Sequence, residues 1–320
     1  MMIWLKRFAA MTLLAVTAAC GGGDDNNTRD LATEATQQGF TALVAAAAKA
    51  GLVPALSSST SSLTVFAPTD AAFTTFAKTL GFSSASAMVT ALDGATLAKI
   101  LQYHVLPGTK TAAALVSGGA TQDTLYAFEG KPATLALSTT AGVKITDEVL
   151  TQATVVTADV VASNGVIHVI DKVLVPPGVL NVVQMAQLNP AFSVLVEAVV
   201  TANLATTLSG TGPFTVFAPT NDAFTAALTE LSLSKAQLLA SPSLAGILTY
   251  HVVAGNVRAV NVVALPKPAS VLTVQGTAFT INADLKIADG RARLASLAAT
   301  DVIASNGVIH VIDKVLLPAL

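Results

Sequence analysis

The chain contains two copies of one sequence pattern, and this internal duplication constrains its fold more than any other feature. The segment Thr64–Phe73 returns as Thr215–Phe224 with eight of ten positions identical. The segment Asp159–Pro176 returns as Asp301–Pro318 with sixteen of eighteen positions identical. The period of about 145 residues is far longer than the roughly 20–50 residues of a solenoid repeat. The sequence therefore predicts two whole domains of one fold.

The joint between the copies is predicted at Pro176-Pro177-Gly178, because prolines stop the preceding strand and glycine frees the next turn. We expect one domain over residues 31–177 and a second over residues 178–320. The length of 320 residues agrees with a prior of about two domains. Each domain is long enough to bury a hydrophobic core without a disulfide or a metal.

Both copies follow one α+β plan. An Ala- and Leu-rich helix is expected first, at about residues 36–50 and 182–202. A short strand, Leu63 to Phe66, then runs toward Pro68, which cannot donate to a ladder and ends the strand. Thr69 and Thr220 are expected to cap the helices that follow, with acidic residues at the positive helix ends. The second half of each copy is rich in Val, Ile and Thr, which favours strands.

The pairs Asn164-Gly165 and Asn306-Gly307 each lie between Val-rich runs and predict a β-hairpin with a two-residue turn at positive φ. This register would place Val161 opposite His168 and Asp159 opposite Ile170. Asp159 and His168 would then lie diagonally on one face, and Asp301 and His310 would repeat the arrangement.

The N-terminal segment has the pattern of a secretory signal peptide. Lys6 and Arg7 precede a twelve-residue apolar run, Phe8 to Ala19, which is too short to span a bilayer. The run ends at Cys20, the only cysteine, and residues 17–20 resemble the lipobox of bacterial lipoproteins. We expect a signal peptide over residues 1–19, lipidation at Cys20, and a glycine-rich flexible tether over residues 20–30. An ordinary signal peptide that leaves a free thiol is the alternative.

Three motifs, in order and seen twice, together resemble the fasciclin (FAS1) domain. They are TVFAPTDAAF and its second copy, the Tyr-His pairs at 103–104 and 250–251, and the two NGVIHVID blocks. The resemblance covers nearly all of residues 31–320. It implies two tandem α+β domains, each a β wedge or sandwich covered by helices. It also implies an exported protein whose commonest role is adhesion or extracellular interaction.

The charge balance and the motifs count against several classes of function. Lys plus Arg total 17 and Asp plus Glu total 19, with no basic block, which counts against nucleic-acid binding. A catalytic role for the four histidines, which all lie in the motifs, competes with the commoner hydrogen-bonded structural histidine. His168 and Asp171 lie on opposite faces of a strand, which is wrong for chelating one ion. We therefore expect no enzyme activity, no cofactor and no metal site.

The Tyr-His pairs, Tyr103-His104 and Tyr250-His251, have two interpretations. They could form a partner-binding edge, because tyrosine is enriched in interface hot spots. They could instead close the junction between helix and sheet. The link of this region to integrin binding in animal family members is not carried over to this chain.

The sequence thus predicts a lipoprotein of the cell envelope that mediates cell adhesion or matrix interaction with a protein or carbohydrate partner. Gly21, rather than Asp, after Cys20 favours the outer membrane by resemblance to enterobacterial lipoproteins. One alternative is a periplasmic enzyme or small-ligand-binding protein with a His-lined pocket. Another is a structural spacer in an envelope complex.

Overall fold

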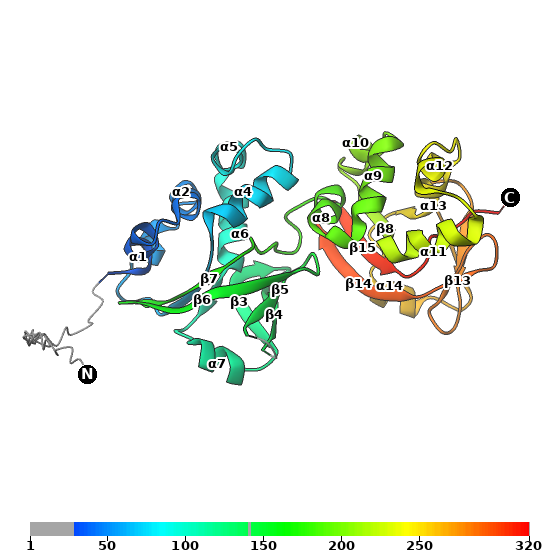
Figure 1. Ribbon diagram of the computed structural model, residues 1–320. Helices are drawn as coiled ribbons and strands as arrows, with labels where there is room; N and C mark the ends of the chain where they lie inside the picture. Colours follow the sequence, from blue (N-terminus) through cyan, green and yellow to red (C-terminus); the bar gives the residue numbers. More distant parts are fainter. Residues whose placement is uncertain (1–28, 140–141, 320) are drawn as a thin grey trace, which may run out of the picture.

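The computed structural model describes residues 29–139 and 142–319 and contains two lobes that follow one another along the chain (Figure 1). We call residues 31–177 the N-terminal repeat and residues 178–320 the C-terminal repeat. The helices of the N-terminal repeat are α1 Leu31–Gln37, α2 Thr41–Lys49, α3 Val53–Leu56, α4 Asp70–Thr79, α5 Ala85–Ala91, α6 Gly94–Tyr103 and α7 Ala112–Ser117. Those of the C-terminal repeat are α8 Val182–Leu188, η1 Pro190–Phe192, α9 Ser193–Thr201, α10 Ala205–Leu208, α11 Asn221–Leu231, α12 Lys235–Leu239, α13 Leu244–Tyr250 and α14 Ala259–Ala264.

The strands of the N-terminal repeat form one seven-stranded sheet with the order β2-β1-β7-β6-β5-β4-β3. They are β1 Leu63–Pro68, β2 Val105–Pro107, β3 Thr121–Phe128, β4 Lys131–Ser138, β5 Lys144–Thr146, β6 Gln152–Ala162 and β7 Gly165–Ile170. Among these strands only β1 and β7 pair in parallel, which joins the two repeated motifs directly.

The C-terminal repeat divides the same plan into two four-stranded sheets, β14-β15-β8-β9 and β10-β11-β12-β13. Its strands are β8 Phe214–Pro219, β9 Val252–Ala254, β10 Ala269–Leu272, β11 Ala278–Ile281, β12 Ile287–Ala288, β13 Leu294–Ala295, β14 Leu297–Ala304 and β15 Gly307–Ile312. The parallel pair β8–β15 repeats the β1–β7 pair residue for residue.

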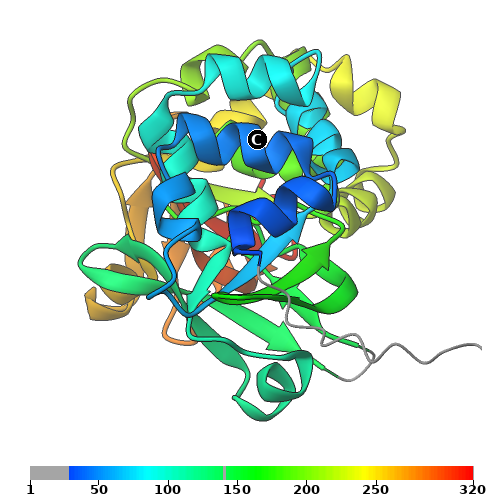
Figure 2. The same ribbon diagram turned by 90° about the vertical axis from the view of Figure 1, so that its left-hand side faces the viewer.

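Strand β1 is buried on both faces because helices cover one face and the β3–β5 strands fold over the other. Val65 and Ala67 belong to the core beneath the helices, and Phe66 belongs to the core on the β side. Side chains alternate along a strand, so one strand serves both layers. Figure 2 shows the blue and cyan helices of the N-terminal repeat above its green strands, whereas the teal helix α7 lies below them. The predicted fold class, tandem α+β domains with β sandwiches covered by helices, is confirmed.

Two local predictions about helices have different outcomes. The predicted caps are confirmed: Thr69 accepts a hydrogen bond from the N–H of Ala72, and Thr220 accepts one from Ala223. The single first helices over residues 36–50 and 182–202 are wrong. Gly39, at φ 79°, separates α1 from α2, and Pro190 separates α8 from α9, since proline lacks the N–H that continues a helix.

The hairpin between β6 and β7 forms, but the predicted turn is wrong by one residue and the predicted pairing by two. Ala162 pairs with Gly165, so Ser163 and Asn164 are the turn residues, and Val161 lies opposite Val166. Asn164 does not adopt a positive φ. The positive φ falls instead on Asp159, at 59°, inside a register shift of β6. Moving the turn by one residue shifts the pairing by two, which keeps each side chain on its face. The predicted diagonal pairing of Asp159 with His168 does not occur, because Asp159 lies in the register shift and its carboxylate bonds the N–H of Ala112. The β14–β15 hairpin repeats the outcome, with φ 58° at Asp301.

The two repeats contact each other where Glu148 accepts the N–H of Ile303, on the edge strand β14, at 2.6 Å. Within the C-terminal repeat, β14 also bonds the segment that precedes α8. The N–H of Gly178 donates to the carbonyl of Ile303 at 2.9 Å, and the N–H of Ser305 donates to the carbonyl of Leu180 at 2.8 Å. Ser163 makes the matching bond to the carbonyl of Arg29 in the N-terminal repeat, at 2.8 Å. The last two residues of the predicted tether, 29 and 30, therefore belong to the folded repeat, and Asp30 caps α1.

Candidate functional site

The Tyr-His pairs at the ends of α6 and α13 are buried. Tyr103, His104, Tyr250 and His251 are each at most 2% exposed. The hydroxyl of Tyr103 donates to the carbonyl of Thr134 at 3.0 Å, and that of Tyr250 donates to Ala278 at 3.2 Å. Each tyrosine thereby ties the last helical turn to the strands of the β layer.

His104 has both ring nitrogens engaged by backbone groups. Nε2 accepts a hydrogen bond from the N–H of Leu174 at 2.8 Å, so Nδ1 carries the proton and donates to the carbonyl of Ile100 at 2.7 Å. Burial lowers the pKa of His104 to about 4, against the hydrogen bond to Ile100. His251 repeats the arrangement with Ile247 and Leu316, at 2.8 Å each, and burial lowers its pKa to about 4.

The burial of the Tyr-His pairs argues against the predicted partner-binding edge. A partner cannot reach Tyr103, His104, Tyr250 or His251 while the repeats keep this structure. These side chains are buried, and their polar atoms are hydrogen-bonded to the protein's own backbone. The arrangement instead matches the other interpretation, in which each pair closes the junction between helix and sheet.

His168 and Asp159 lie close together, but their side chains do not pair. The backbone N–H of Asp159 donates to Nδ1 of His168 at 3.3 Å, and Nε2 of His168 donates to the carbonyl of Lys110 at 2.8 Å. The Asp159 carboxylate turns away and accepts the N–H of Ala112, at the start of α7, at 2.8 Å. A catalytic carboxylate would have to bond the imidazole itself.

His310 and Asp301 repeat this brace in the C-terminal repeat. The N–H of Asp301 donates to Nδ1 of His310 at 3.3 Å, and its carboxylate accepts the N–H of Ala259 at 2.9 Å. Nε2 of His310 donates to the carbonyl of Val257 at 2.8 Å. Both histidines therefore hold a bulged strand to the segment before a short helix.

Asn164 and Asn306 hold each hairpin tip against the helices through buried side chains. Oδ1 of Asn164 accepts the N–H of Leu31 at 2.9 Å, and Nδ2 donates to the carbonyls of Leu56 and Ser58 at 2.8 and 3.0 Å. Asn306 makes the same three bonds, to Val182, Leu208 and Gly210. The asparagine is thus required for its amide and not for a positive φ.

Gly165 and Gly307 follow these asparagines because the chain passes too close for a side chain. A Cβ on Gly165 would lie 2.1 Å from the carbonyl oxygen of Leu63, and one on Gly307 would lie 2.0 Å from that of Phe214. The Asn-Gly pair therefore marks the start of the parallel contact between β1 and β7, and between β8 and β15.

Each repeat also holds a buried carboxylate that the sequence motifs did not indicate. Oδ2 of Asp147 accepts the N–H of Val175 at 3.0 Å, and Oδ2 of Asp289 accepts that of Leu317 at 2.9 Å. Each aspartate lies 28 residues before its partner, and this shared spacing is the signal that could have identified it. Arg293 pairs with Asp289, whose pKa is lowered, whereas burial raises the pKa of Asp147 to about 6.

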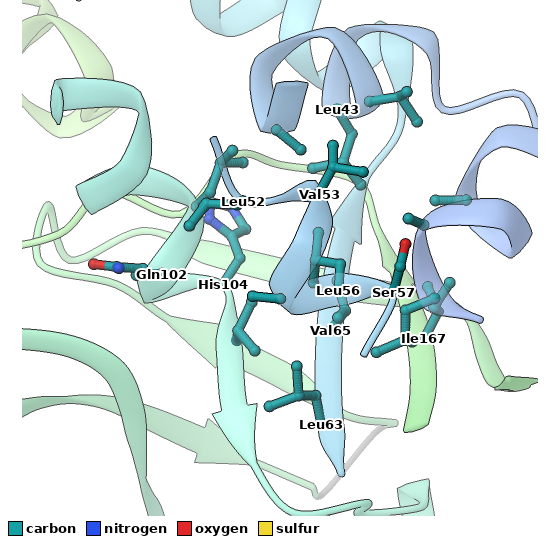
Figure 3. Close-up of a pocket in the computed structure, with 18 of the residues that line it drawn as sticks. Leu43, Leu52, Val53, Leu56, Ser57, Leu63, Val65, Gln102, His104 and Ile167 are labelled. Carbon is teal, nitrogen blue, oxygen red and sulfur yellow. The ribbon is translucent and has the colours of Figure 1, made fainter. Parts of the chain in front are cut away.

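An apolar cavity of about 340 Å³ opens in the N-terminal repeat between α1, α2, α3 and the strands beneath them (Figure 3). Figure 3 shows Leu43 and Val53 on the helix side and Leu63 and Val65 on the strand side, with His104 at one end. The corresponding cavity of the C-terminal repeat measures about 40 Å³.

The described residues also bear on two other kinds of site, a metal centre and a membrane-spanning helix. No group of three or more His, Cys, Asp or Glu side chains there is placed to hold a metal ion. No single helix of this part of the chain is long and apolar enough to cross a membrane, although the bent pair Val182–Leu188 and Pro190–Thr201 meets the length and composition test together. Cys20, the predicted signal peptide and the predicted tether up to residue 28 lie outside the described residues.

Comparison with known proteins identifies one family. The model of the fasciclin domain matches residues 38–176 and 190–318. Protein sll1483 of Synechocystis is 44% identical over 147 residues, which cover 44% of this chain and 75% of the relative. The cell surface glycolipoprotein MPB83 of Mycobacterium bovis is 37% identical over 143 residues, or 41% of this chain and 57% of the relative.

Animal proteins are also similar. The transforming growth factor-beta-induced protein ig-h3 of Sus scrofa is 34% identical over 164 residues, which cover 50% of this chain and 22% of the relative. Among solved structures, a FAS1 domain pair from the insect cell adhesion molecule Fasciclin I aligns with a TM-score of 0.45 at 18% identity. The alignment covers 89% of this chain and 94% of that one.

Proposed function

Because the chain belongs to the fasciclin domain family, we propose that it is an exported lipoprotein, held in the cell envelope through Cys20, whose two domains mediate cell adhesion or extracellular protein interaction. The double family match over most of the chain is the observation that carries this proposal. The similarity to a cell surface glycolipoprotein supports export and surface placement. The signal-like segment before Cys20 supports the lipid anchor.

The proposed interaction is non-enzymatic and uses exposed surface. The four motif histidines each have both ring nitrogens bonded to backbone groups, so none is available as a general base. The partner is a protein or carbohydrate outside the cell, and the outer membrane is the proposed site of the anchor.

The first experiment is protease digestion of the fasciclin domains on intact cells, beside permeabilised cells. We expect digestion in intact cells, and then reduced adhesion of a deletion strain that the intact gene restores. Protection until permeabilisation would place the domains in the periplasm and would rule out adhesion to other cells.

The anchor is tested separately with Cys20→Ser. This variant is expected to lose labelling by a radioactive fatty acid and to leave the membrane fraction, because its only thiol is gone. A Ser59→Ala variant, altered at an exposed loop position, is the control and should remain in the membrane fraction. Retention of the Cys20→Ser chain in the membrane fraction would contradict the lipid anchor.

The alternative of a small-ligand-binding protein has one observation in its favour, which is the cavity beside His104 in the N-terminal repeat. This observation gives His104 no chemical role, because both of its ring nitrogens are hydrogen-bonded to backbone groups. The cavity is compatible with adhesion by other surfaces.

A further inference from the structure

The cavity of the N-terminal repeat has an almost wholly aliphatic lining. Its walls are Leu, Val, Ala and Ile side chains from α1–α3, β1, β2, β7 and the end of α6. No charged side chain lines it, and its volume of about 340 Å³ lies in the range of small-molecule sites. Such walls favour a hydrocarbon and offer no counter-ion to a buried charge.

Most polar groups of the cavity lie among residues of its margin or are already bonded, and the half-buried Gln102 of α6 points away from the other lining side chains in Figure 3. Thr33, Thr36 and Ser57 are exposed, and the hydroxyl of Thr36 donates to the carbonyl of Ala32. His104 has no free ring nitrogen. A ligand would therefore keep its polar end at the margin and bury only its apolar part.

The C-terminal repeat is an internal control, because the same framework there is nearly closed. Matched residues such as Leu43 and Leu195, or His104 and His251, line both sites. The lining differs where Ala47 of α2 corresponds to Val199 of α9. Leu63 of β1 lines the larger cavity, whereas the corresponding Phe214 of β8 packs against the core without lining the smaller one. Larger side chains at these two positions accompany the fall from about 340 to about 40 Å³.

An open cavity of this kind is costly unless something fills it. Its lining loses packing contacts in proportion to the volume, and water gains few hydrogen bonds from aliphatic walls. The C-terminal repeat shows that the fold does not require the opening.

We propose that the cavity of the N-terminal repeat binds the aliphatic chain of a free monoacyl lipid, such as a long-chain fatty acid, with the carboxylate in solvent at the margin of the cavity. The start of the folded repeat supports this choice of ligand. Leu31, the first residue of α1, lines the cavity and lies eleven residues after Cys20. Eleven residues span at most about 37 Å, so an anchor at Cys20 would keep the cavity close to the membrane.

The test is fluorescence titration with cis-parinaric acid, whose emission rises when its chain leaves water. The protein is the full chain carrying Cys20→Ser, so that no covalent acyl chain competes. We expect saturable binding at one site. The variant Ala47→Val with Leu63→Phe, which carries the residues of the C-terminal repeat, should bind at least tenfold more weakly.

A reciprocal variant keeps the proposal testable even if the filled variant does not fold. Val199→Ala with Phe214→Leu should open the second cavity and raise the stoichiometry from one to two. Circular dichroism establishes that each variant is folded. Absence of saturable binding by the parent chain, or unchanged binding and stoichiometry in folded variants, would overturn the proposal.

Vesicles of phosphatidylcholine separate a free acyl chain from a bilayer. The Cys20→Ser chain should not sediment with these vesicles, whereas it binds the fatty acid in solution. Sedimentation that depends on Ala47 and Leu63, without fatty-acid binding, would assign the cavity to the bilayer and contradict the proposal. Either result leaves the adhesion proposal standing, because adhesion is measured on cells and through other surfaces.

Discussion

At the scale of single residues, the polar side chains of the repeated motifs serve the backbone. His104, His168 and Asn164 each bond main-chain groups that are far away in the sequence, and their second-repeat counterparts do the same. Buried polar groups require such partners, and losing one partner leaves the other unsatisfied at a cost of about 1–3 kcal/mol. Stability alone is therefore enough to explain why both repeats contain the same His and Asn residues.

The His104 ring is expected to stay neutral, with its proton on Nδ1, down to about pH 5, because burial lowers its pKa to about 4. Its ¹⁵N chemical shifts, followed from pH 8 to pH 5, check this prediction. His251 should behave alike. A ring that titrates near its ordinary pKa of 6.5 would show that the site opens to water.

Asn164→Ala is expected to destabilise the N-terminal repeat by about 3 kcal/mol, because it removes three buried hydrogen bonds and leaves the partners unpaired. Thermal unfolding measures the loss. Asn306→Ala is the matched change in the C-terminal repeat and should lower the stability of that repeat instead. Ser163→Ala, at the exposed neighbouring turn position, is the control and should have little effect. Equal effects of Asn164→Ala and Ser163→Ala would mean that the turn needs no amide.

At the scale of elements, the loop between β5 and β6 joins the two repeats. Oε1 of Glu148 accepts the N–H of Ile303, on β14, at 2.6 Å. Burial, together with the charges of Asp147 and Asp301, raises the pKa of Glu148 to about 7, although the Ile303 N–H and Arg258 oppose the shift. Gly290 occupies the matching place in the C-terminal repeat, so this carboxyl belongs to the N-terminal repeat alone.

Glu148→Gln is expected to stabilise the chain relative to its parent as the pH rises. The pKa of Glu148 is raised from an ordinary 4.5 to about 7, so its contribution is fully present below pH 4.5 and is lost as the pH rises through 7. Glutamine stays neutral and keeps the acceptor oxygen. Each pKa unit is worth about 1.4 kcal/mol, and we expect a difference of about 3 kcal/mol at pH 8 and little at pH 4.5.

Thermal unfolding of variant and parent at each pH measures this difference. The comparison cancels the opposite trend from His104 and His251, whose lowered pKa values remove stability as the pH falls below 6.5. Glu129→Gln is a control, because its exposed ion pair with Arg258 also joins the repeats but is worth little. A Glu148→Gln difference that does not change with pH would contradict a raised pKa in the interface.

At the scale of the whole molecule, each repeat has its own β-side core, whereas the core beneath the helices runs through both. Contact between α4 and α8, the hydrogen bond from Ile303 to Glu148 and the ion pair of Glu129 with Arg258 link the lobes. We expect some mutual stabilisation, because each lobe covers apolar and backbone groups of the other.

Residues 31–177 and 178–320, expressed separately, are each expected to unfold cooperatively, because each holds its own motif histidines and its own hairpin asparagine. The C-terminal fragment should be less stable than in the full chain, since it loses the Glu148 bond to Ile303. Calorimetry of both fragments and of the full chain checks this. If neither fragment folds, the repeats are not independent domains.

The sequence by itself determined the duplication, the order of elements, the helix caps and the existence of both terminal hairpins, because these follow from local patterns repeated in one chain. Tertiary structure decided the turn at Ser163-Asn164. There the bonds from Asn164 to residues more than 100 positions away outweigh the local preference of Asn-Gly for a positive φ. It also decided the cavity: the two repeats share nearly one framework, and its volume depends on how a few side chains from separate elements meet. Such long-range packing has no period along the sequence.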